Sequence, residues 1–425
     1  MGFQTPALYI LFCVGAARWK EIRKTGKRLR FASIGRKPTM RLAHFLARPL
    51  CTITLCCFLI AGAAIRSAAV AAPVLGTYNV EPTQITISGF SAGGFFAMQM
   101  GIAYSSVFAG VGIFAGGPYD CARHALVFGC VNNAVPEIGE SIANMKSWSG
   151  NRIDNVLNIG RQRIYIFSGK QDYMVGPNVT RQVKRLYVDV GGFDSAENVK
   201  YVELAGASHT FPTAFDGAGD SPCNLTLLPY ISDCGFDGAG DALRWFYGTL
   251  RPPNTGTLRG TLLAFDQTPF AGRDAGMDST GWVYVPADCA AGRRCGLHVA
   301  LHGCQQAYAI AGAYFLNNTG YNRWADTNDL IVLYPQTSAS LTNPFGCWDW
   351  FGLYGTDFDQ KSGTQMKALM AMIRQIAGGR SVMGRARNAH SPERNPSSAR
   401  TDAAQSPALS GRPRRSGEAW AREGS

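Results

Sequence analysis

Short apolar runs rich in β-branched residues recur through the middle of the 425-residue chain. Each run is bounded by glycine, proline or polar residues, which is the pattern of a buried strand. Stretches with apolar residues at helical spacing lie between several of these runs, and this alternation favours an α/β fold with a mostly parallel sheet. Strands are predicted at 84–88, 111–115, 163–168, 199–204, 282–286, 296–301 and 330–334, and helices directly after residue 91, at 322–328 and at 363–376.

The strand and helix patterns predict a single domain over residues 72–377. A stretch at 255–261 looks like a connector, but strand patterns continue on both sides of it. We therefore interpret it as a crossover within one domain, whose length is sufficient for a large core. No internal repeat is present.

The residues before Ala72 have the pattern of an export signal. Basic residues precede the apolar run 50–64, and small residues follow it. These features are typical of a secretory signal peptide, whereas a transmembrane helix needs a longer apolar run. We predict an N-terminal extension plus signal peptide at 1–71, with translation starting at Met40 and cleavage after Ala71; an uncleaved anchor is the alternative. The mature protein is expected to be secreted or periplasmic.

The basic charge of the chain is concentrated at its two ends. Residues 1–71 carry 12 Lys and Arg against one Glu, and residues 378–425 carry 9 Lys and Arg against four acidic residues. Of the formal net charge of +12, this leaves −4 for residues 72–377, which argues against a nucleic-acid partner. The segment 378–425 has few large apolar residues, so it is predicted to be a disordered basic tail. No stable membrane association is expected after signal cleavage.

Eight cysteines remain when the four in the predicted leader are set aside. An even number in an exported chain indicates disulfide bridges. No C-x-x-C pair typical of a zinc site is present among them, so no metal is predicted. Three pairs are close in sequence and a fourth closes a long loop, although eight cysteines allow many other connectivities. The pairs suggested by spacing are Cys121 with Cys130, Cys223 with Cys234, Cys289 with Cys295, and Cys304 with Cys347.

The predicted strand at 84–88 runs into Gly89-Phe90-Ser91-Ala92-Gly93 and then into a helical pattern. Strand, G-x-S-x-G and helix in this order is the context of a nucleophile elbow, in which the serine lies on a strained turn. The glycines let the strand and helix backbones approach each other. A turn without chemistry is the alternative, but the order of the elements favours Ser91 as a nucleophile.

A serine hydroxyl needs a base that accepts its proton. Four histidines lie in the predicted domain. His298 falls inside a predicted strand and is expected to be a core residue, His124 follows a cysteine in a predicted surface loop, and His302 precedes a glycine. His209 follows the predicted strand 199–204 in a loop of small residues, and it is the predicted base.

The base in turn needs an acid that orients it. Asp172 directly follows the predicted strand 163–168 and lies between Ser91 and His209 in sequence. This order is that of α/β-hydrolases, and strand ends of a parallel sheet share one edge. Asp172 is therefore the predicted acid, with turn capping as its alternative role. The competing aspartates, none of which follows a buried strand so directly, are Asp120, Asp154, Asp189 and Asp194.

A tetrahedral intermediate of ester cleavage needs two backbone N–H donors. The residue after the nucleophile, Ala92, supplies one, and the second comes from another loop. The stretch His302-Gly303-Cys304 follows a predicted strand and has the required character, but it lies far after Ser91, whereas the usual order places it before. Either it is a plain turn or the hydrolase sheet is circularly permuted.

A family resemblance favours the second reading. The stretches GFSAGG, SGKQD, GASH, LHGCQQ, NRWAD, LIVLYPQ and CWDWF, in this order, resemble the catalytic domain of type II poly(3-hydroxybutyrate) depolymerases. The resemblance covers most of Val80–Ile376. It implies a circularly permuted α/β-hydrolase fold with a triad of Ser91, Asp172 and His209.

The resemblance also implies roles around the triad. Ala92 and Cys304 would donate to the oxyanion, and Cys304 would be bridged to Cys347. Tryptophans are common in protein cores, so packing is the alternative to a binding role for the two in CWDWF. The residues expected at the substrate are Trp348, Trp350, Phe90 and His302.

The sequence thus predicts a secreted serine esterase that hydrolyses poly(3-hydroxybutyrate) or its oligomers. A feruloyl or acetylxylan esterase of the same fold is the alternative, and a non-catalytic polymer-binding module is a further one. No cofactor is predicted, because no dinucleotide fingerprint or metal-ligand cluster is present. Depolymerases that attack crystalline granules commonly carry a substrate-binding domain after the catalytic one. Only the basic tail follows here, so amorphous polymer or soluble oligomers are the expected substrates.

Overall fold

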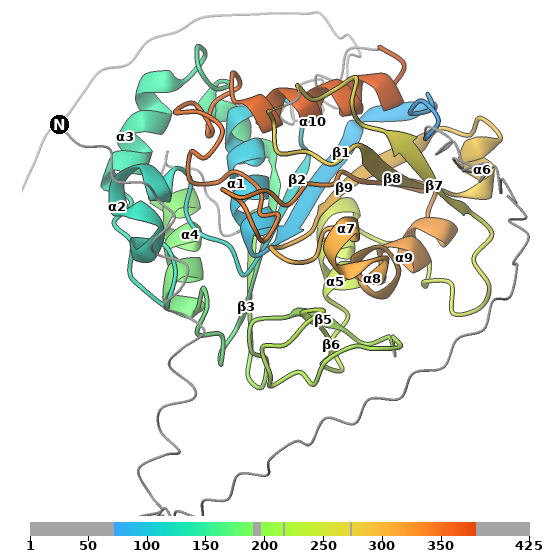
Figure 1. The fold of residues 1–425 in the computed structure, drawn as a ribbon, viewed down its shortest axis with the longest axis horizontal. Helices are drawn as coiled ribbons and strands as arrows, with labels where there is room; N and C mark the ends of the chain where they lie inside the picture. The colour runs from blue at the N-terminus through green and yellow to red at the C-terminus, as the bar shows by residue number, and fades with distance from the viewer. Residues whose placement is uncertain (1–71, 190–196, 216, 273, 380–425) are drawn as a thin grey trace, which may run out of the picture. The chain divides into compact units, whose positions relative to one another are not determined.

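Seven strands predicted from the sequence, together with an eighth, form one sheet in the computed structural model of the chain (Figure 1). The structure describes residues 72–189, 197–215, 217–272 and 274–379, which belong to one compact unit. The predicted leader at 1–71 and nearly all of the predicted tail lie outside the described residues. The strands of the sheet are β1 (Val80–Phe90), β2 (Gly110–Phe114), β3 (Arg163–Gly169), β4 (Val199–Leu204), β7 (Thr261–Asp266), β8 (Thr280–Val285), β9 (Cys295–Leu301) and β10 (Leu330–Tyr334).

The strand order in the sheet is β4-β3-β2-β1-β9-β10-β8-β7. The first six of these run parallel, whereas β8 is antiparallel to both of its neighbours. Strand β1 therefore lies between β2 and β9, although β9 comes much later in the chain. The register pairs Gly89 of β1 with Leu301 of β9, so both strands end at the same edge.

Helices cover both faces of the sheet (Figure 1). Gly101 of α1 packs on Val111, whereas Phe246 of α5 packs on Gly110 and Gly112; since neighbouring strand residues point to opposite faces, α1 and α5 lie on opposite sides. Of the helices in the described residues, none combines the length and hydrophobicity needed to span a bilayer. The helices are α1 (Ala92–Ala103), α2 (Cys121–Gly129), α3 (Gly139–Trp148), the 3₁₀ helix η2 (Val156–Arg161), α4 (Pro177–Asp189), α5 (Gly238–Tyr247), α6 (Ala287–Ala290), α7 (Tyr308–Ala311), α8 (Tyr314–Asn318), α9 (Tyr321–Thr327) and α10 (Thr364–Ile376).

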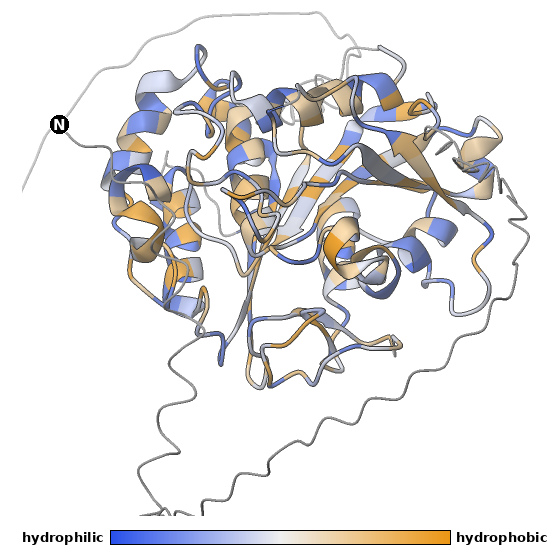
Figure 2. Cartoon of the chain, in the orientation of Figure 1, coloured by the Kyte–Doolittle hydropathy of each residue, from blue (hydrophilic) through white to orange (hydrophobic). Residues whose placement is uncertain are grey.

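The core lies between these layers, and Figure 2 shows hydrophobic residues both in the strands and in the helices that cover them. Every residue of β2, β9 and β10 is buried, as is every residue of α1. Strands buried on both faces read as continuous apolar runs rather than as alternating ones, which is why the sequence pattern located them. A helix that is apolar all round is likewise a buried one.

Some elements differ from the sequence prediction. The connector predicted at 255–261 ends in the first residue of β7, an edge strand that the prediction missed because only part of it is buried. The predicted surface loop around His124 is helix α2. A separate pair of three-residue parallel strands, β5 (Phe211–Thr213) and β6 (Ile231–Asp233), is too short to give a sequence pattern.

All four cysteine pairs suggested by spacing form disulfides. Three of them close short loops, and the fourth joins Cys304 to Cys347 across 43 positions. The eight cysteines of the predicted domain are thus all bonded to one another. In the described ranges, no cluster of three or more His, Cys, Asp or Glu side chains could hold a metal ion.

A buried polar network lies under β1 on the side of α5 and α9. The ring of His298 contacts Thr86 Oγ1 at 2.8 Å through Nδ1 and Ser88 Oγ at 2.9 Å through Nε2. Tyr247 of α5 and Tyr321 of α9 bond to the same two hydroxyls. The prediction that His298 is a satisfied core histidine is confirmed. Burial lowers the pKa of this histidine to about 3, so the ring is neutral in the folded state at ordinary pH.

Because the buried ring resists protonation, His298 should make stability fall on acidification. An unfolded histidine binds a proton below about pH 6.5, and the folded one does so only near pH 3. The contribution of the neutral His298 ring to the free energy of unfolding is thus complete above pH 6.5. It is lost as the pH falls toward 3, and the free energy of unfolding then decreases by about 1.4 kcal/mol per pH unit. We predict that His298→Gln lowers stability at pH 7 but flattens its pH dependence between pH 7 and 5, measured by urea unfolding.

The control is Thr86→Val, which removes one hydrogen bond of the network and keeps the titrating ring. It should lower stability at both pH values and retain the wild-type slope. An equal slope in His298→Gln and wild type would contradict the assignment.

Candidate active site

Ser91 lies on the turn between β1 and α1 in a left-handed conformation, with φ 55° and ψ −122°. Residues with a side chain rarely adopt this conformation, and it is found at strained functional turns. The turn is held by bonds from the Ser91 N–H to the Phe114 oxygen at 2.9 Å and from the Phe95 N–H to the Ser91 oxygen at 3.0 Å. A Cβ on Gly89 would clash with the Gly93 carbonyl group, so this glycine is required at the elbow.

The three side chains predicted to act together form one hydrogen-bonded chain. His209 Nε2 lies 3.0 Å from Ser91 Oγ, and His209 Nδ1 lies 2.9 Å from Asp172 Oδ2. Asp172 follows β3 and His209 follows β4, so each comes from the carboxyl end of a different parallel strand. Phe90, which was predicted at the substrate, is buried and packs on the imidazole with ring centroids 4.8 Å apart.

The surroundings of Asp172 keep its carboxylate ionised. Burial raises the pKa of this group, but His209 and the N–H groups of Met174 and Val175 outweigh burial, so the pKa lies below its ordinary value. These N–H groups donate to Oδ1 at 2.8 and 3.0 Å, which leaves Oδ2 for the imidazole. An ionised carboxylate only accepts hydrogen bonds. Nδ1 of His209 therefore carries the proton, and Nε2 can accept the one from Ser91.

The turn after β9, residues 302–306, lies against the elbow. A Cβ on Gly303 would lie 3.1 Å from Ser91 Cβ, and a Cβ on Gly93 would clash with the His302 carbonyl oxygen. Glycine at these two positions permits the approach of the two backbones. The 302–306 turn is thus brought to the nucleophile, together with Cys304.

The peptide group between Gly303 and Cys304 has a fixed orientation. Its carbonyl oxygen accepts from His302 Nδ1 at 2.7 Å and from the Gln306 N–H at 3.3 Å. In a trans peptide the N–H points away from the C=O, so the anchored carbonyl directs the Cys304 N–H to the opposite side. Within the described part of the chain, this N–H donates to no acceptor. The Ala92 N–H begins α1 and has no acceptor within its helix.

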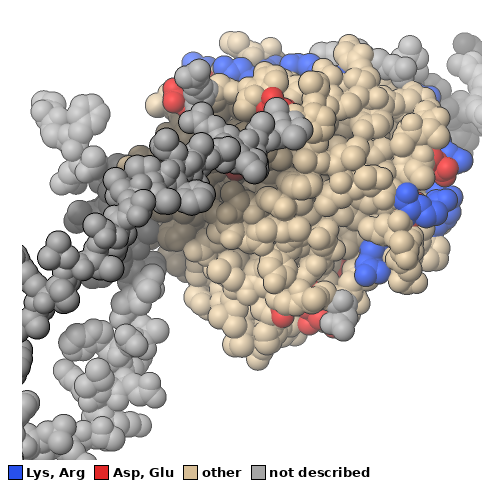
Figure 3. Space-filling view, turned by 45° about the vertical axis from the view of Figure 1, so that its right-hand side comes forward, with Lys and Arg blue, Asp and Glu red and all other residues tan. Residues whose placement is uncertain are grey.

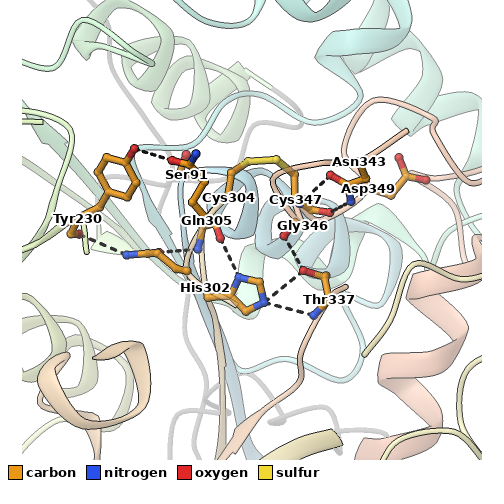
Figure 4. Close-up of a disulfide and its surroundings, with 12 residues drawn as sticks. Ser91, Tyr230, His302, Cys304, Gln305, Thr337, Asn343, Gly346, Cys347 and Asp349 are labelled. Atoms are coloured by element: carbon orange, nitrogen blue, oxygen red, sulfur yellow. Dashed lines mark hydrogen bonds between the residues drawn. A yellow bond between two sulfur atoms is a disulfide. The ribbon is translucent and has the colours of Figure 1, made fainter. Parts of the chain in front are cut away.

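His302 holds the Gly303 carbonyl from inside the protein. Its ring is fully buried, and the Thr337 N–H donates to Nε2 at 3.3 Å, so Nδ1 carries the ring proton (Figure 4). Burial lowers the pKa of His302 to about 4, although the bond to the Gly303 carbonyl acts in the opposite direction. The sequence prediction placed His302 at the substrate, whereas the structure places its side chain behind the turn.

A disulfide fixes the same turn from the other side. Cys304 and Cys347 are joined with their Cα atoms 4.3 Å apart (Figure 4). The Cys347 N–H donates to Asn343 Oδ1 at 2.9 Å, and the Asn343 side-chain amide donates to the Cys347 oxygen at 2.8 Å. A further bond runs from the Gln305 N–H to the Phe345 oxygen at 2.7 Å. The segment 343–347 therefore braces the 302–306 turn.

The two tryptophans after the bridge face α1 rather than solvent. Trp348 is fully buried and stacks on Phe96 with ring centroids 4.9 Å apart. Trp350 is 6% exposed and stacks on Phe95 at 4.1 Å. The sequence prediction placed both at the substrate; the structure gives Trp348 a packing position and leaves a small part of Trp350 exposed.

Exposed apolar side chains border the triad, and the sequence prediction missed them. Tyr173 and Met174 directly follow the triad aspartate and are 63% and 45% exposed. Leu227 and Leu228 are more than half exposed and precede Tyr230, whose ring lies 6.3 Å from the triad histidine. For Tyr173 and Met174 the available signal was two large apolar residues directly after the SGKQD stretch, whereas Leu227 and Leu228 lie beside none of the motifs. On the face drawn in Figure 3, the Lys, Arg, Asp and Glu residues that are visible lie mostly near the edges.

No family model matches the chain. It is 51% identical over 329 residues to the polyhydroxybutyrate depolymerase of Talaromyces funiculosus, with 74% of this chain and 96% of the relative covered. It is 40% identical to the poly(3-hydroxybutyrate) depolymerase of Delftia acidovorans, with 73% of this chain and 63% of that relative covered.

Two solved structures are also similar. One is a PHB depolymerase in which a serine is replaced by alanine, complexed with R3HB trimer, and the other is the PHB depolymerase of Penicillium funiculosum. Each is 50% identical to this chain with a TM-score of 0.69, and covers 72% of this chain and 99% of its own. With more than half of its aligned residues shared over nearly the whole length of a curated relative, the chain belongs to the polyhydroxybutyrate depolymerase family.

Proposed function

We propose that the protein is an exported serine esterase that hydrolyses poly(3-hydroxybutyrate) or its oligomers. The observation that carries this proposal is the hydrogen-bonded chain from Ser91 through His209 to Asp172, beside two backbone N–H groups with no protein acceptor in the described residues. This arrangement supports acyl transfer. The names of the relatives supply the substrate class.

In the first half of the reaction, Ser91 Oγ attacks the ester carbonyl carbon while His209 Nε2 accepts the hydroxyl proton. The negative charge that develops on the carbonyl oxygen is bound by the N–H groups of Ala92 and Cys304. His209 then gives its proton to the departing alcohol, and the ester bond breaks. In the second half, water attacks the acyl carbon while His209 takes its proton; the bond to Ser91 Oγ then breaks, His209 returns the proton to Oγ, and the free acid leaves.

The surface around the site supports a neutral polyester as the substrate. The segments that follow β9 and β10, 302–322 and 335–348, contain no Lys, Arg, Asp or Glu, and neither does the segment 221–232. The exposed side chains of Tyr173, Met174 and the neighbouring leucines add apolar area there. A hydroxybutyrate ester has short apolar arms and no charge, so this surface can bind it by burial of apolar area. Trp350 is partly exposed, unlike Trp348, and is the tryptophan that we assign to the substrate.

We further propose the division of the chain into a leader at 1–71, a catalytic domain at 72–377 and a basic tail at 378–425. Four disulfides support export to an oxidising compartment, since such bridges are rare in reducing ones. The leader would be removed at the membrane. Mass spectrometry of the exported protein tests the predicted start at Ala72.

The substrate assignment is tested with a panel of esters. We expect the purified protein to clear suspensions of amorphous poly(3-hydroxybutyrate) and to cleave (R)-3-hydroxybutyrate oligomers. Turnover of methyl ferulate and acetylated xylan should be at least about tenfold slower, because the exposed side chains beside the triad are mostly apolar. Product release is measured by chromatography. Rapid turnover of the ferulate or the xylan with intact granules would favour the alternative esterase.

The triad is expected to act as a unit. Ser91→Ala, His209→Ala and the double variant should each lower kcat by several orders of magnitude, with no further loss on combination, because each removes the same proton-coupled attack. Asp172→Asn should cost about 10⁴-fold, because an amide favours the wrong imidazole tautomer. The initial rates of p-nitrophenyl butyrate hydrolysis by each variant measure these losses of kcat. Near-full activity of Ser91→Ala would refute the assignment.

The bridge next to the oxyanion donor should matter more for turnover than its energetic contribution suggests. A disulfide typically stabilises a protein by about 2–4 kcal/mol, and the double variant Cys304→Ser/Cys347→Ser also frees the donor peptide. We expect kcat to fall about tenfold or more at a temperature where the variant is folded. The matched control, Cys289→Ser/Cys295→Ser, removes a remote bridge and should lower Tm while keeping kcat. Equal kcat in both variants would contradict the role of the bridge.

A further inference from the structure

We propose that Gln306 is a positioning residue that joins the oxyanion-binding turn to the loop beside the catalytic histidine. The inference rests on the proposed function, since it assigns Cys304 as an oxyanion donor. It concerns a side chain that lies outside the triad and the two donors, and is 1% exposed. Such a buried amide needs partners for both of its ends.

One end of the amide holds the 302–306 turn. Gln306 Oε1 accepts the Gly303 N–H at 2.6 Å, and the Gln306 backbone N–H donates to the Gly303 oxygen at 3.3 Å. Both polar groups of Gly303 are therefore bound, the oxygen also by His302. The Gly303 oxygen and the Cys304 N–H belong to one planar peptide, so fixing the first sets the direction of the second. The Gln306 side chain acts on this peptide from its other end, by holding the Gly303 N–H.

The other end of the amide holds the loop 226–230. Gln306 Nε2 donates to the Pro229 oxygen at 2.7 Å and to the Tyr230 oxygen at 3.4 Å. A second connection runs between the same segments, from the Tyr230 hydroxyl to Gln305 Oε1 at 2.7 Å (Figure 4). The two segments are thus joined by side chains from neighbouring positions.

The loop 226–230 in turn contacts the catalytic histidine. Thr226 Oγ1 accepts the His209 N–H at 3.3 Å, and the Tyr230 ring stands edge-on to the imidazole at 6.3 Å. The two ends of the Gln306 side chain thus contact the two parts of the site, the 302–306 turn and the loop 226–230. Gln306 fixes the distance between the group that moves the proton and the group that binds the oxyanion, and small errors in such distances have large effects on rate.

The test compares Gln306→Leu, which keeps the side-chain bulk and removes both amide interactions, with wild type on p-nitrophenyl butyrate. Loss of one oxyanion donor costs about 10²–10³ in kcat, and a displaced donor should cost less. We expect kcat to fall about 10- to 100-fold with KM changed little, and inactivation by a phosphonate ester to slow in parallel, because its adduct also places an oxygen at the donors.

The matched control is Gln162→Leu. Gln162 is equally buried, and its Nε2 donates to the oxygens of Gly101 and Phe108 at 3.0 and 3.1 Å, at the opposite end of β3 from Asp172. Gln162→Leu should lower Tm by about as much as Gln306→Leu does, and its kcat should equal that of wild type. Unchanged kcat in Gln306→Leu, or an equal loss in Gln162→Leu, would overturn the inference. An inactive wild type would instead count against the proposed function.

If Gln306→Leu does not fold, Gln306→Glu tests the positioning role of this side chain. A protonated glutamate at position 306 can accept from Gly303 and donate to Pro229, whereas an ionised one can only accept. We expect the kcat of Gln306→Glu, taken as a ratio to wild type at each pH, to fall as pH rises while the variant stays folded. A ratio near one that does not change with pH would overturn the inference.

Discussion

The close approach of two strand ends is the constraint on which the rest of the site depends. Strands β1 and β9 are parallel neighbours in register, so the elbow that follows one meets the turn that follows the other. The approach is so close that a Cβ at Gly93 would clash with the His302 oxygen. Ser91 and the Cys304 N–H, the proposed second oxyanion donor, are therefore placed by the backbone of the sheet, and the side chains refine a geometry that the strands already impose.

Buried polar side chains fix the remaining details of the site geometry. Asp172 remains ionised although burial opposes its charge, because His209 and two N–H groups stabilise the carboxylate. His302 remains neutral because burial opposes its protonation, and as a neutral ring it can donate from Nδ1 while it accepts at Nε2. Each of these groups thus has one protonation state and one direction, which is what preorganised catalysis requires. The Cys304–Cys347 bridge holds the same turn covalently.

Local signals in the sequence located the strands, the three side chains of the Ser91–His209–Asp172 chain and three disulfide pairs, whereas the Cys304–Cys347 pair, 43 positions apart, was left over after the three close pairs. Buried parallel strands read as apolar runs, and reactive residues followed them directly. Strand β7 is only partly buried and gave no such signal. The orientations of Trp348 and His302 were not predictable, since a ring beside a motif can face either the substrate or the core, and only the packing on Phe96 decides for Trp348. The network of Gln306 depends on contacts between distant loops, which no local pattern encodes.

The central claim is that Ser91 becomes acylated by a hydroxybutyrate ester. It is tested most directly by mixing the enzyme with (R)-3-hydroxybutyrate oligomers, quenching with acid within one turnover, and mapping the modified peptide by mass spectrometry. The account predicts a 3-hydroxybutyryl group on Ser91, absent in Ser91→Ala, with accumulation raised when deacylation is slowed at low pH. An acyl group on another residue, or hydrolysis without any covalent intermediate, would contradict it.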